Sequence, residues 1–200
     1  MRGLLKWSLA LSTLGLAAAA QAGVAWDESG AAGDLSNNRL LPTLVTLLPG
    51  PNEIHGLTGN AGSGVDRDYF SVDVPVGTIL SSLILLADTN VSGGSSFIGI
   101  QVGPQITVTP EGAGAEALLG FSHYTNDMVG QNLLALIGQP GGLAAGRYSF
   151  WVQDTGGPAS YGMDFELNPV PLPAAAWLLM SGLAGFATLR RSRNRALSSS

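Results

Sequence analysis

Glycine density is the feature that most restricts what this 200-residue chain can fold into. Residues 23–168 contain 24 glycines in 146 positions, which is more than twice the average usage of roughly 7%. Each glycine in a helix interior costs about 1 kcal/mol relative to alanine, so long helices are disfavoured. The chain has no cysteine, which excludes disulfide bonds and thiolate-based redox or zinc chemistry. We therefore expect one domain of short strands joined by glycine-rich turns.

Runs in which apolar and polar residues alternate predict where the strands lie. In one run Phe70, Val72 and Val74 alternate with polar neighbours and stop before a Pro-Val-Gly turn. Comparable runs predict strands at 78–86, 97–102, 105–109, 147–153 and 161–167, with 97–102 and 105–109 paired around a turn at 103–104. One short helical piece is expected at 132–137. Seven to nine strands at this spacing predict an all-β fold, an antiparallel β-sandwich or jelly roll.

The charges are sharply partitioned along the chain. Residues 23–168 hold all fourteen acidic residues but only three basic ones, Arg39, Arg67 and Arg147, for a net charge of −11. A body this acidic repels phosphate backbones, which excludes nucleic acid as an expected partner.

Residues 1–22 have the three regions of a secretory signal peptide. Arg2 and Lys6 form a basic start, an apolar stretch runs from Trp7 to Ala20, and small residues flank Gln21. We expect signal peptidase to cleave after Ala22, so that the mature chain begins with a domain at 23–168. The alternative is a short membrane anchor.

A second apolar unit lies near the C-terminus. Residues 170–189 carry no charge and are followed at once by Arg190, Arg191, Arg193 and Arg195. The helical part, 174–189, would be about 24 Å long, which is short for a hydrocarbon core of about 30 Å. Trp177 is expected near one interface, and the positive-inside rule places the arginines in the cytoplasm and the acidic domain outside the inner membrane.

The sequence of this C-terminal unit resembles the VPLPA variant of PEP-CTERM sorting signals. The resemblance rests on a short motif, an apolar segment containing Ser181-Gly182-Leu183, the arginine cluster and the C-terminal position, over 169–195 with a tail at 196–200. The motif is Val170, Pro171, Leu172, Pro173 and Ala174, with leucine where the namesake motif has glutamate. The resemblance implies an exosortase-type membrane protease that cleaves near the motif, in a Gram-negative bacterium that makes exopolysaccharide. A plain C-terminal anchor is the alternative.

Four segments of the domain, 33–38, 58–59, 66–77 and 145–152, read GDLSNN, TG, DRDYFSVDVPVG and AGRYSFWV. In these segments the domain resembles the bacterial pre-peptidase C-terminal domain, and the similarity spans most of residues 27–168. The resemblance implies a jelly-roll β-sandwich that serves as a non-catalytic accessory module of secreted proteins. Some members bind calcium near their N-terminal segment.

Calcium is the candidate cofactor, although no cofactor is certain from sequence. Hard cations take six to eight oxygen ligands. Carboxylate and amide oxygens cluster in an early irregular segment and just before the strand expected at Tyr69; the candidate ligands are Asp27, Glu28, Asp34, Asn37, Asp66 and Asp68. The alternative is ordinary turn chemistry, in which Asp and Asn cap loops through their own backbones.

Candidate catalytic residues are few. His55 lies in an apparent strand and His123 in an expected loop, and no serine occupies a Gly-x-Ser-x-Gly motif. A sugar-stacking platform of Trp26, Trp151 and Tyr161 is a further hypothesis, with Trp151 partly exposed or else packed beneath a loop. We expect a non-catalytic protein, exported to the cell surface or medium and associated with exopolysaccharide or adhesion. The alternatives are a secreted glycan- or peptide-hydrolysing enzyme and a periplasmic protein that stays anchored.

Overall fold

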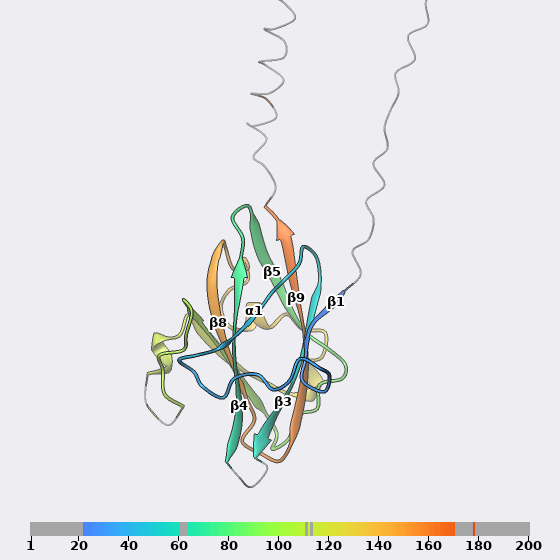
Figure 1. The fold of residues 1–200 in the computed structure, drawn as a ribbon, viewed down its shortest axis with the longest axis vertical. Helices are drawn as coiled ribbons and strands as arrows, with labels where there is room; N and C mark the ends of the chain where they lie inside the picture. Colours follow the sequence, from blue (N-terminus) through green and yellow to red (C-terminus); the bar gives the residue numbers. More distant parts are fainter. Residues whose placement is uncertain (1–21, 61–63, 111, 113, 171–177, 179–200) are drawn as a thin grey trace, which may run out of the picture.

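The computed structural model describes residues 22–60, 64–110, 112, 114–170 and 178. In this part of the chain nine strands form one sheet that curls into a half-barrel (Figure 1). The strands are β1 (Gly23–Asp27), β2 (Thr43–Val45), β3 (Asn52–Asn60), β4 (Val65–Val74), β5 (Thr78–Leu85), β6 (Ser96–Val102), β7 (Gly120–Tyr124), β8 (Gly146–Gln153) and β9 (Ala159–Pro169); the helical pieces are η1 (Ala115–Ala117), η2 (Asn126–Met128) and α1 (Leu133–Leu136). The predicted all-β class is confirmed.

Seven strands follow the order β5-β9-β3-β4-β8-β6-β7 and pair antiparallel with their neighbours. The two remaining strands depart from the expected antiparallel pattern: β1 pairs parallel with β3, and β2 pairs parallel with β4. The reason is that β3 and β4 pair with each other only near their hairpin, at Gly59–Asp66 and Asn60–Val65. Farther from the hairpin each has a free edge, which β1 or β2 fills. The connection between β1 and β2, residues 28–42, crosses the open side of the half-barrel (Figure 1).

The inner face of the sheet carries the main core. Phe70 of β4 lies opposite Phe150 of β8, with the two rings stacked and their centroids 5.2 Å apart. Phe165 of β9 meets both rings edge-on. Leu35, from the connection at 28–42, is buried in the same core. Burial of this leucine anchors the connection to the sheet.

A second, smaller cluster lies on the outer face and involves residues 105–109 and Trp151. Residues 105–109 do not form a strand, because Arg39 satisfies their backbone: its guanidinium donates to the carbonyls of Ile106 and Thr107 at 3.0 and 2.9 Å. Ile106 then packs with Tyr69 and Trp151. Trp151 is therefore only 5% exposed, so of the two alternatives for this residue, partial exposure and packing beneath a loop, the structure has the second.

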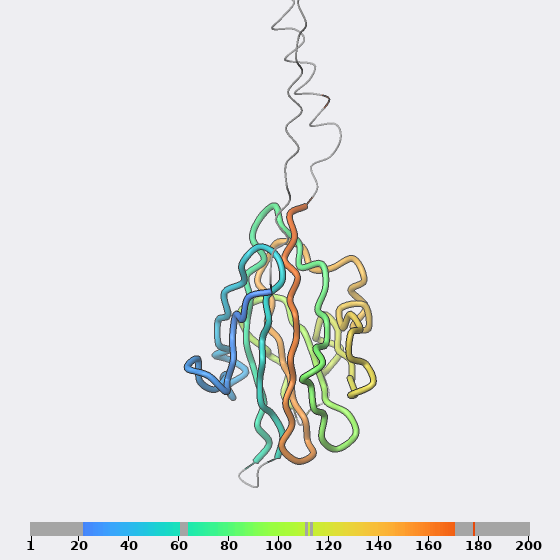
Figure 2. The backbone as a smooth tube through the Cα atoms, turned by 90° about the vertical axis from the view of Figure 1, so that its right-hand side faces the viewer, coloured from blue at the N-terminus to red at the C-terminus, as the bar shows by residue number. Residues whose placement is uncertain are grey.

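The segment 126–143 covers the edge of β5. Leu80 and Leu143 exchange two backbone hydrogen bonds of 2.9 Å across this edge. The expected helix is confirmed as α1, and the Asn132 side chain caps it by accepting from the Leu134 N–H. Figure 2 shows this segment on the opposite flank of the molecule from the connection at 28–42.

Within the described residues, no helix has the length and apolar character needed to cross a membrane. Several predicted segments lie outside the described residues: the signal peptide up to Gln21, the motif from Pro171 to Ala174, Trp177 and the arginine cluster.

Asn52 organises the turn that leads into β3, and its removal is expected to destabilise the domain. Its buried amide donates to the carbonyls of Leu48, Gly50 and Phe165 and accepts from the Leu48 N–H. Asn52→Ala would remove these hydrogen bonds, leaving the Gly50 carbonyl with only its bond from the Leu167 N–H. We expect a loss of about 2 kcal/mol in the free energy of unfolding. Urea denaturation checks this. Asn168→Ala, which loses one hydrogen bond to Ser81, is the control, and an equal loss in both variants would contradict the assignment.

Candidate metal centre

Three carboxylates from separate parts of the sequence meet where the connection at 28–42 lies against the sheet. Glu28 follows β1, Asp34 lies within the connection, and Asp68 belongs to β4. One oxygen of each carboxylate lies within 4.8 Å of the corresponding oxygens of the other two. Among the described residues, this is the group of three side chains close enough to share a metal ion.

Glu28 ties the connection to β3. Its carboxylate accepts two short hydrogen bonds, from the backbone N–H of Leu35 and from the backbone N–H of Leu57. Leu35 is buried in the core, and its backbone N–H donates to Glu28. These two contacts of Leu35 hold the neighbouring Asp34 in position.

Two backbone contacts tie the same connection to β4. The N–H of Tyr69 donates to the carbonyl of Ser36 at 2.9 Å, and the N–H of Arg67 donates to Oδ1 of Asn37 at 2.8 Å. These contacts lie on either side of Asp68 in the sequence, so Asp68 is held opposite the connection.

Asp68 is the most unusual residue of the site. It is fully buried, at 0% exposure, yet neither carboxylate oxygen has a hydrogen-bond partner. The hydroxyl of Tyr161 is also buried without a partner; it lies near enough to act on the pKa of Asp68, although the two groups do not form a hydrogen bond of good geometry. An uncompensated buried carboxylate is costly, and such a group normally holds a proton or a cation.

The electrostatics of the cluster favour a bound positive charge. Burial raises the pKa of Asp68 to about 9, and the negative charges of Glu28, Asp66 and Asp34 push in the same direction. Burial raises the pKa of Glu28 to about 7, against the lowering effect of its two backbone hydrogen bonds. The pKa of Asp34 is raised as well, by burial and then by Asp66. A cation among these groups would relieve both the desolvation and the mutual repulsion.

The donor set fits a hard cation. All donors are carboxylate oxygens, the type that Ca²⁺ prefers at 2.3–2.6 Å. Ligands on opposite sides of such an ion are separated by about 5 Å, so oxygens within 4.8 Å of one another can reach one ion.

The structure brings together some of the predicted ligands and separates others. Asp66 joins Glu28, Asp34 and Asp68 as a nearby charge. Asp66 and Asp68 lie inside β4, which begins at Val65, rather than before the strand as expected. Asp27 points away from the cluster and accepts hydrogen bonds from the backbone and hydroxyl of Ser29.

The predicted ligand Asn37 accepts a hydrogen bond from the backbone N–H of Arg67 through Oδ1. The remaining coordination positions would fall to water or to Asp66.

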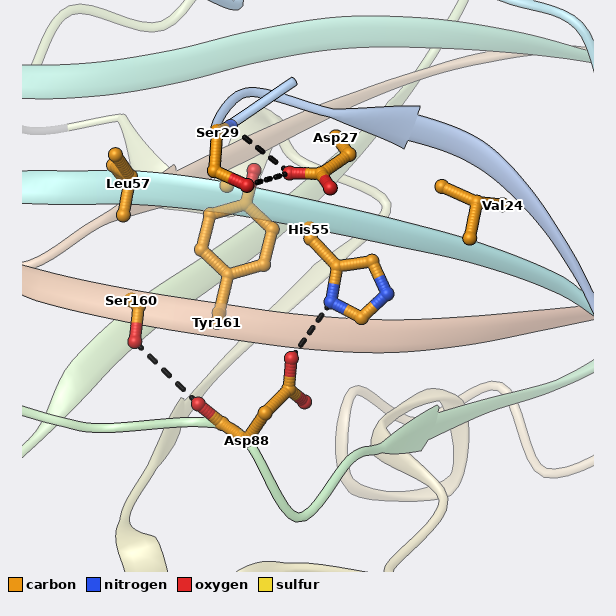
Figure 3. A pocket seen from close by; sticks show the side chains of 9 residues that line it. Val24, Asp27, Ser29, His55, Leu57, Asp88, Ser160 and Tyr161 are labelled. Atoms are coloured by element: carbon orange, nitrogen blue, oxygen red, sulfur yellow. Dashed lines mark hydrogen bonds and ion pairs between the residues drawn. The ribbon is translucent and has the colours of Figure 1, made fainter.

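A pocket of about 360 Å³ lies on the outer side of β1, β3 and β9 and contains His55 (Figure 3). Nδ1 of His55 lies 2.7 Å from Asp88 and Nε2 lies 3.2 Å from Glu53. Partial burial opposes the positive charge, but these two carboxylates outweigh it and raise the pKa of His55. An imidazolium bonded at both nitrogens has no lone pair for general-base work. The hydroxyl of Ser29, in the same pocket, donates to Asp27 rather than to the imidazole.

The other residues considered for catalysis or sugar binding are packed against neighbouring side chains or buried. His123 lies in β7 rather than in a loop, with its ring edge-on to Phe97. Trp151 and Tyr161 are buried, so they do not form an exposed sugar platform with Trp26. Tyr161, suggested by the sequence only for the sugar platform, instead lies at the metal centre: nothing in the alternating stripe of β9 indicates that its hydroxyl ends near Asp68.

No protein-family model matches the sequence, and a comparison with curated proteins returns no significant match.

Proposed function

We propose that this protein is an exported, non-catalytic β-domain of the bacterial envelope or extracellular matrix whose fold is completed by a calcium ion. The observation that carries the proposal is the meeting of Glu28, Asp34 and Asp68, with both oxygens of the buried Asp68 left without partners. The ion would join the connection at 28–42 to β4 and stabilise the open side of the half-barrel.

The composition of the site suits a location outside the cell. Three carboxylates without an EF-hand loop make a site of moderate affinity, and extracellular calcium modules bind in the range of about 10⁻⁴ to 10⁻³ M. Calcium at such concentrations is met outside the cytoplasm, in agreement with the signal peptide predicted at 1–22.

The ends of the described domain agree with processing at both termini. β1 begins at Gly23, directly after the exposed Ala22 at which signal peptidase is expected to cleave. β9 ends at Pro169, and the exposed Val170 opens the VPLPA motif. Cleavage at either position would leave every strand intact. An exosortase-type protease is the expected second processing enzyme, with inner-membrane tethering before release.

The finer fold proposed is a jelly-roll β-sandwich similar to the pre-peptidase C-terminal domain. The hairpin of β3 and β4 divides the strands into two groups, with β1, β3, β9 and β5 on one side and β2, β4, β8, β6 and β7 on the other. The phenylalanines of β4, β8 and β9 meet between them. Exopolysaccharide is the proposed partner of the outer surface, on the basis of the sorting signal alone.

Intact mass spectrometry of membrane and medium fractions from an expressing Gram-negative host tests the export and sorting. We expect a released species that begins at Gly23 and ends within 170–174. A species found only in the membrane and still ending at Ser200 would contradict release and favour a permanently anchored periplasmic protein.

A further inference from the structure

The buried polar atoms that lack partners all lie in one place. Among the described residues, the buried side-chain oxygen and nitrogen atoms without a hydrogen bond are the two carboxylate oxygens of Asp68 and the hydroxyl of Tyr161. Native interiors leave few such groups, and each calls for a ligand, an ion or a water. A cation bound through one oxygen of Asp68 would leave the other oxygen without a partner, and no mode of binding to Asp68 alone accounts for the tyrosine hydroxyl.

The sheet has room for the Tyr161 ring where it passes β3. Tyr161 lies on β9 and is 1% exposed, and its ring passes beneath β3 at Gly56, which pairs with it in register. A Cβ atom at position 56 would collide with the end of the ring and with the hydroxyl. Glycine at this position therefore allows the hydroxyl to reach the metal centre.

We propose that Tyr161 is a positioning residue of the cation site, which donates its hydroxyl proton to one oxygen of Asp68 and so turns the other oxygen toward the ion. The inference rests on the proposed calcium site. It accounts for all three atoms at once: one oxygen binds the ion, the other accepts from Tyr161, and the hydroxyl has its acceptor. Outer partners of this kind hold metal-binding carboxylates in place, and their loss typically weakens metal binding 10- to 100-fold.

The test compares Tyr161→Phe with the wild-type full chain, purified after export. We expect the calcium dissociation constant, measured by calorimetry, to rise about tenfold or more in the variant. Thermal unfolding in chelator should be unchanged or occur at a higher temperature, because the variant removes a buried hydroxyl that has no partner in the calcium-free protein. Tyr148→Phe is the matched control, because its hydroxyl donates to the carbonyl of Ala144 at 3.0 Å, away from the cluster; it should lose stability equally with and without calcium.

A spectroscopic measurement on the wild-type protein tests the inference without relying on the variant's folding. Calcium should shift the ultraviolet difference spectrum of tyrosine, as expected when a phenol begins to donate to a carboxylate, and Tyr148→Phe should retain the shift. Unchanged calcium affinity in Tyr161→Phe, an equal loss of stability with and without calcium, or no spectral shift on calcium binding would overturn the role of Tyr161. A wild-type protein that binds no calcium would overturn the proposed function and this inference with it.

Discussion

We expect calcium to raise the thermal midpoint of the wild-type protein and Asp68→Asn to remove that gain. At a calcium concentration one hundred times the dissociation constant, binding to the folded state alone contributes about 2.7 kcal/mol, or about 5 to 10 °C for a domain of this size. Asparagine keeps the shape of the buried side chain but supplies no negative charge. In chelator, we expect the variant to be at least as stable as the wild-type protein, because it buries no carboxyl group against Glu28 and Asp34.

Differential scanning calorimetry with and without calcium measures both effects. Asp73→Asn is the matched control: it removes a carboxylate from the same strand, but this carboxylate is half exposed and paired with Arg147. The control should lose at most about 1 kcal/mol and keep the full calcium effect. Equal calcium effects in the wild-type protein and Asp68→Asn would place any bound ion elsewhere.

Without calcium, the free energy of unfolding should fall as the pH rises from 5 to 8. In the folded state the pKa of Asp68 is raised to about 9 and that of Glu28 to about 7, from ordinary values of 3.8 and 4.5. Between these limits the folded protein retains protons that the unfolded chain has released, so stability decreases with pH. Glu28 contributes to this decrease up to about pH 7 and Asp68 up to about pH 9, and solvent screening reduces the contribution of the partly exposed Glu28.

Urea denaturation in metal-free buffer across this range checks the slope. The raised pKa of His55 acts in the same direction, so the informative quantity is the difference between the wild-type protein and Asp68→Asn. The variant should show the shallower slope. Saturating calcium should flatten the wild-type slope, because the ion takes the place of the protons. If stability falls with pH equally in both proteins without calcium, Asp68 does not keep a proton in the folded state that the unfolded chain has released.

The strands that the sequence predicted best are those with one buried face. The stripe of β9 from Tyr161 to Leu167 alternates because one face meets the main core. In β4 the face of Phe70, Val72 and Val74 meets the same core, and Tyr69 on the other face packs in the outer cluster. Residues 105–109 alternate in the same way, but Ile106 and Val108 pack on the outer cluster. Their backbone carbonyls accept hydrogen bonds from Arg39, which is far away in the sequence. Local periodicity carries no information about such a partner.

The type of ligand at the metal centre was predictable from the sequence, but which residues come together there was not. The sequence pointed to Asp66 and Asp68, expected just before a strand, and the early acidic segment suggested where partners would come from. Both residues lie inside β4, where their spacing places them on one face of the strand. Asp27 and Glu28 are adjacent, and only the tertiary structure decides which of them points inward. Glu28 does so because its carboxylate meets the backbone N–H groups of Leu35 and Leu57.

Isothermal titration calorimetry of the exported wild-type protein, beside Asp68→Asn under the same conditions, tests most directly whether one calcium ion binds between the connection at 28–42 and β4. We expect one calcium ion per wild-type chain, with a dissociation constant at or below about 10⁻³ M, and no measurable binding to Asp68→Asn. No binding to the wild-type protein, or equal binding to both proteins, would contradict this expectation.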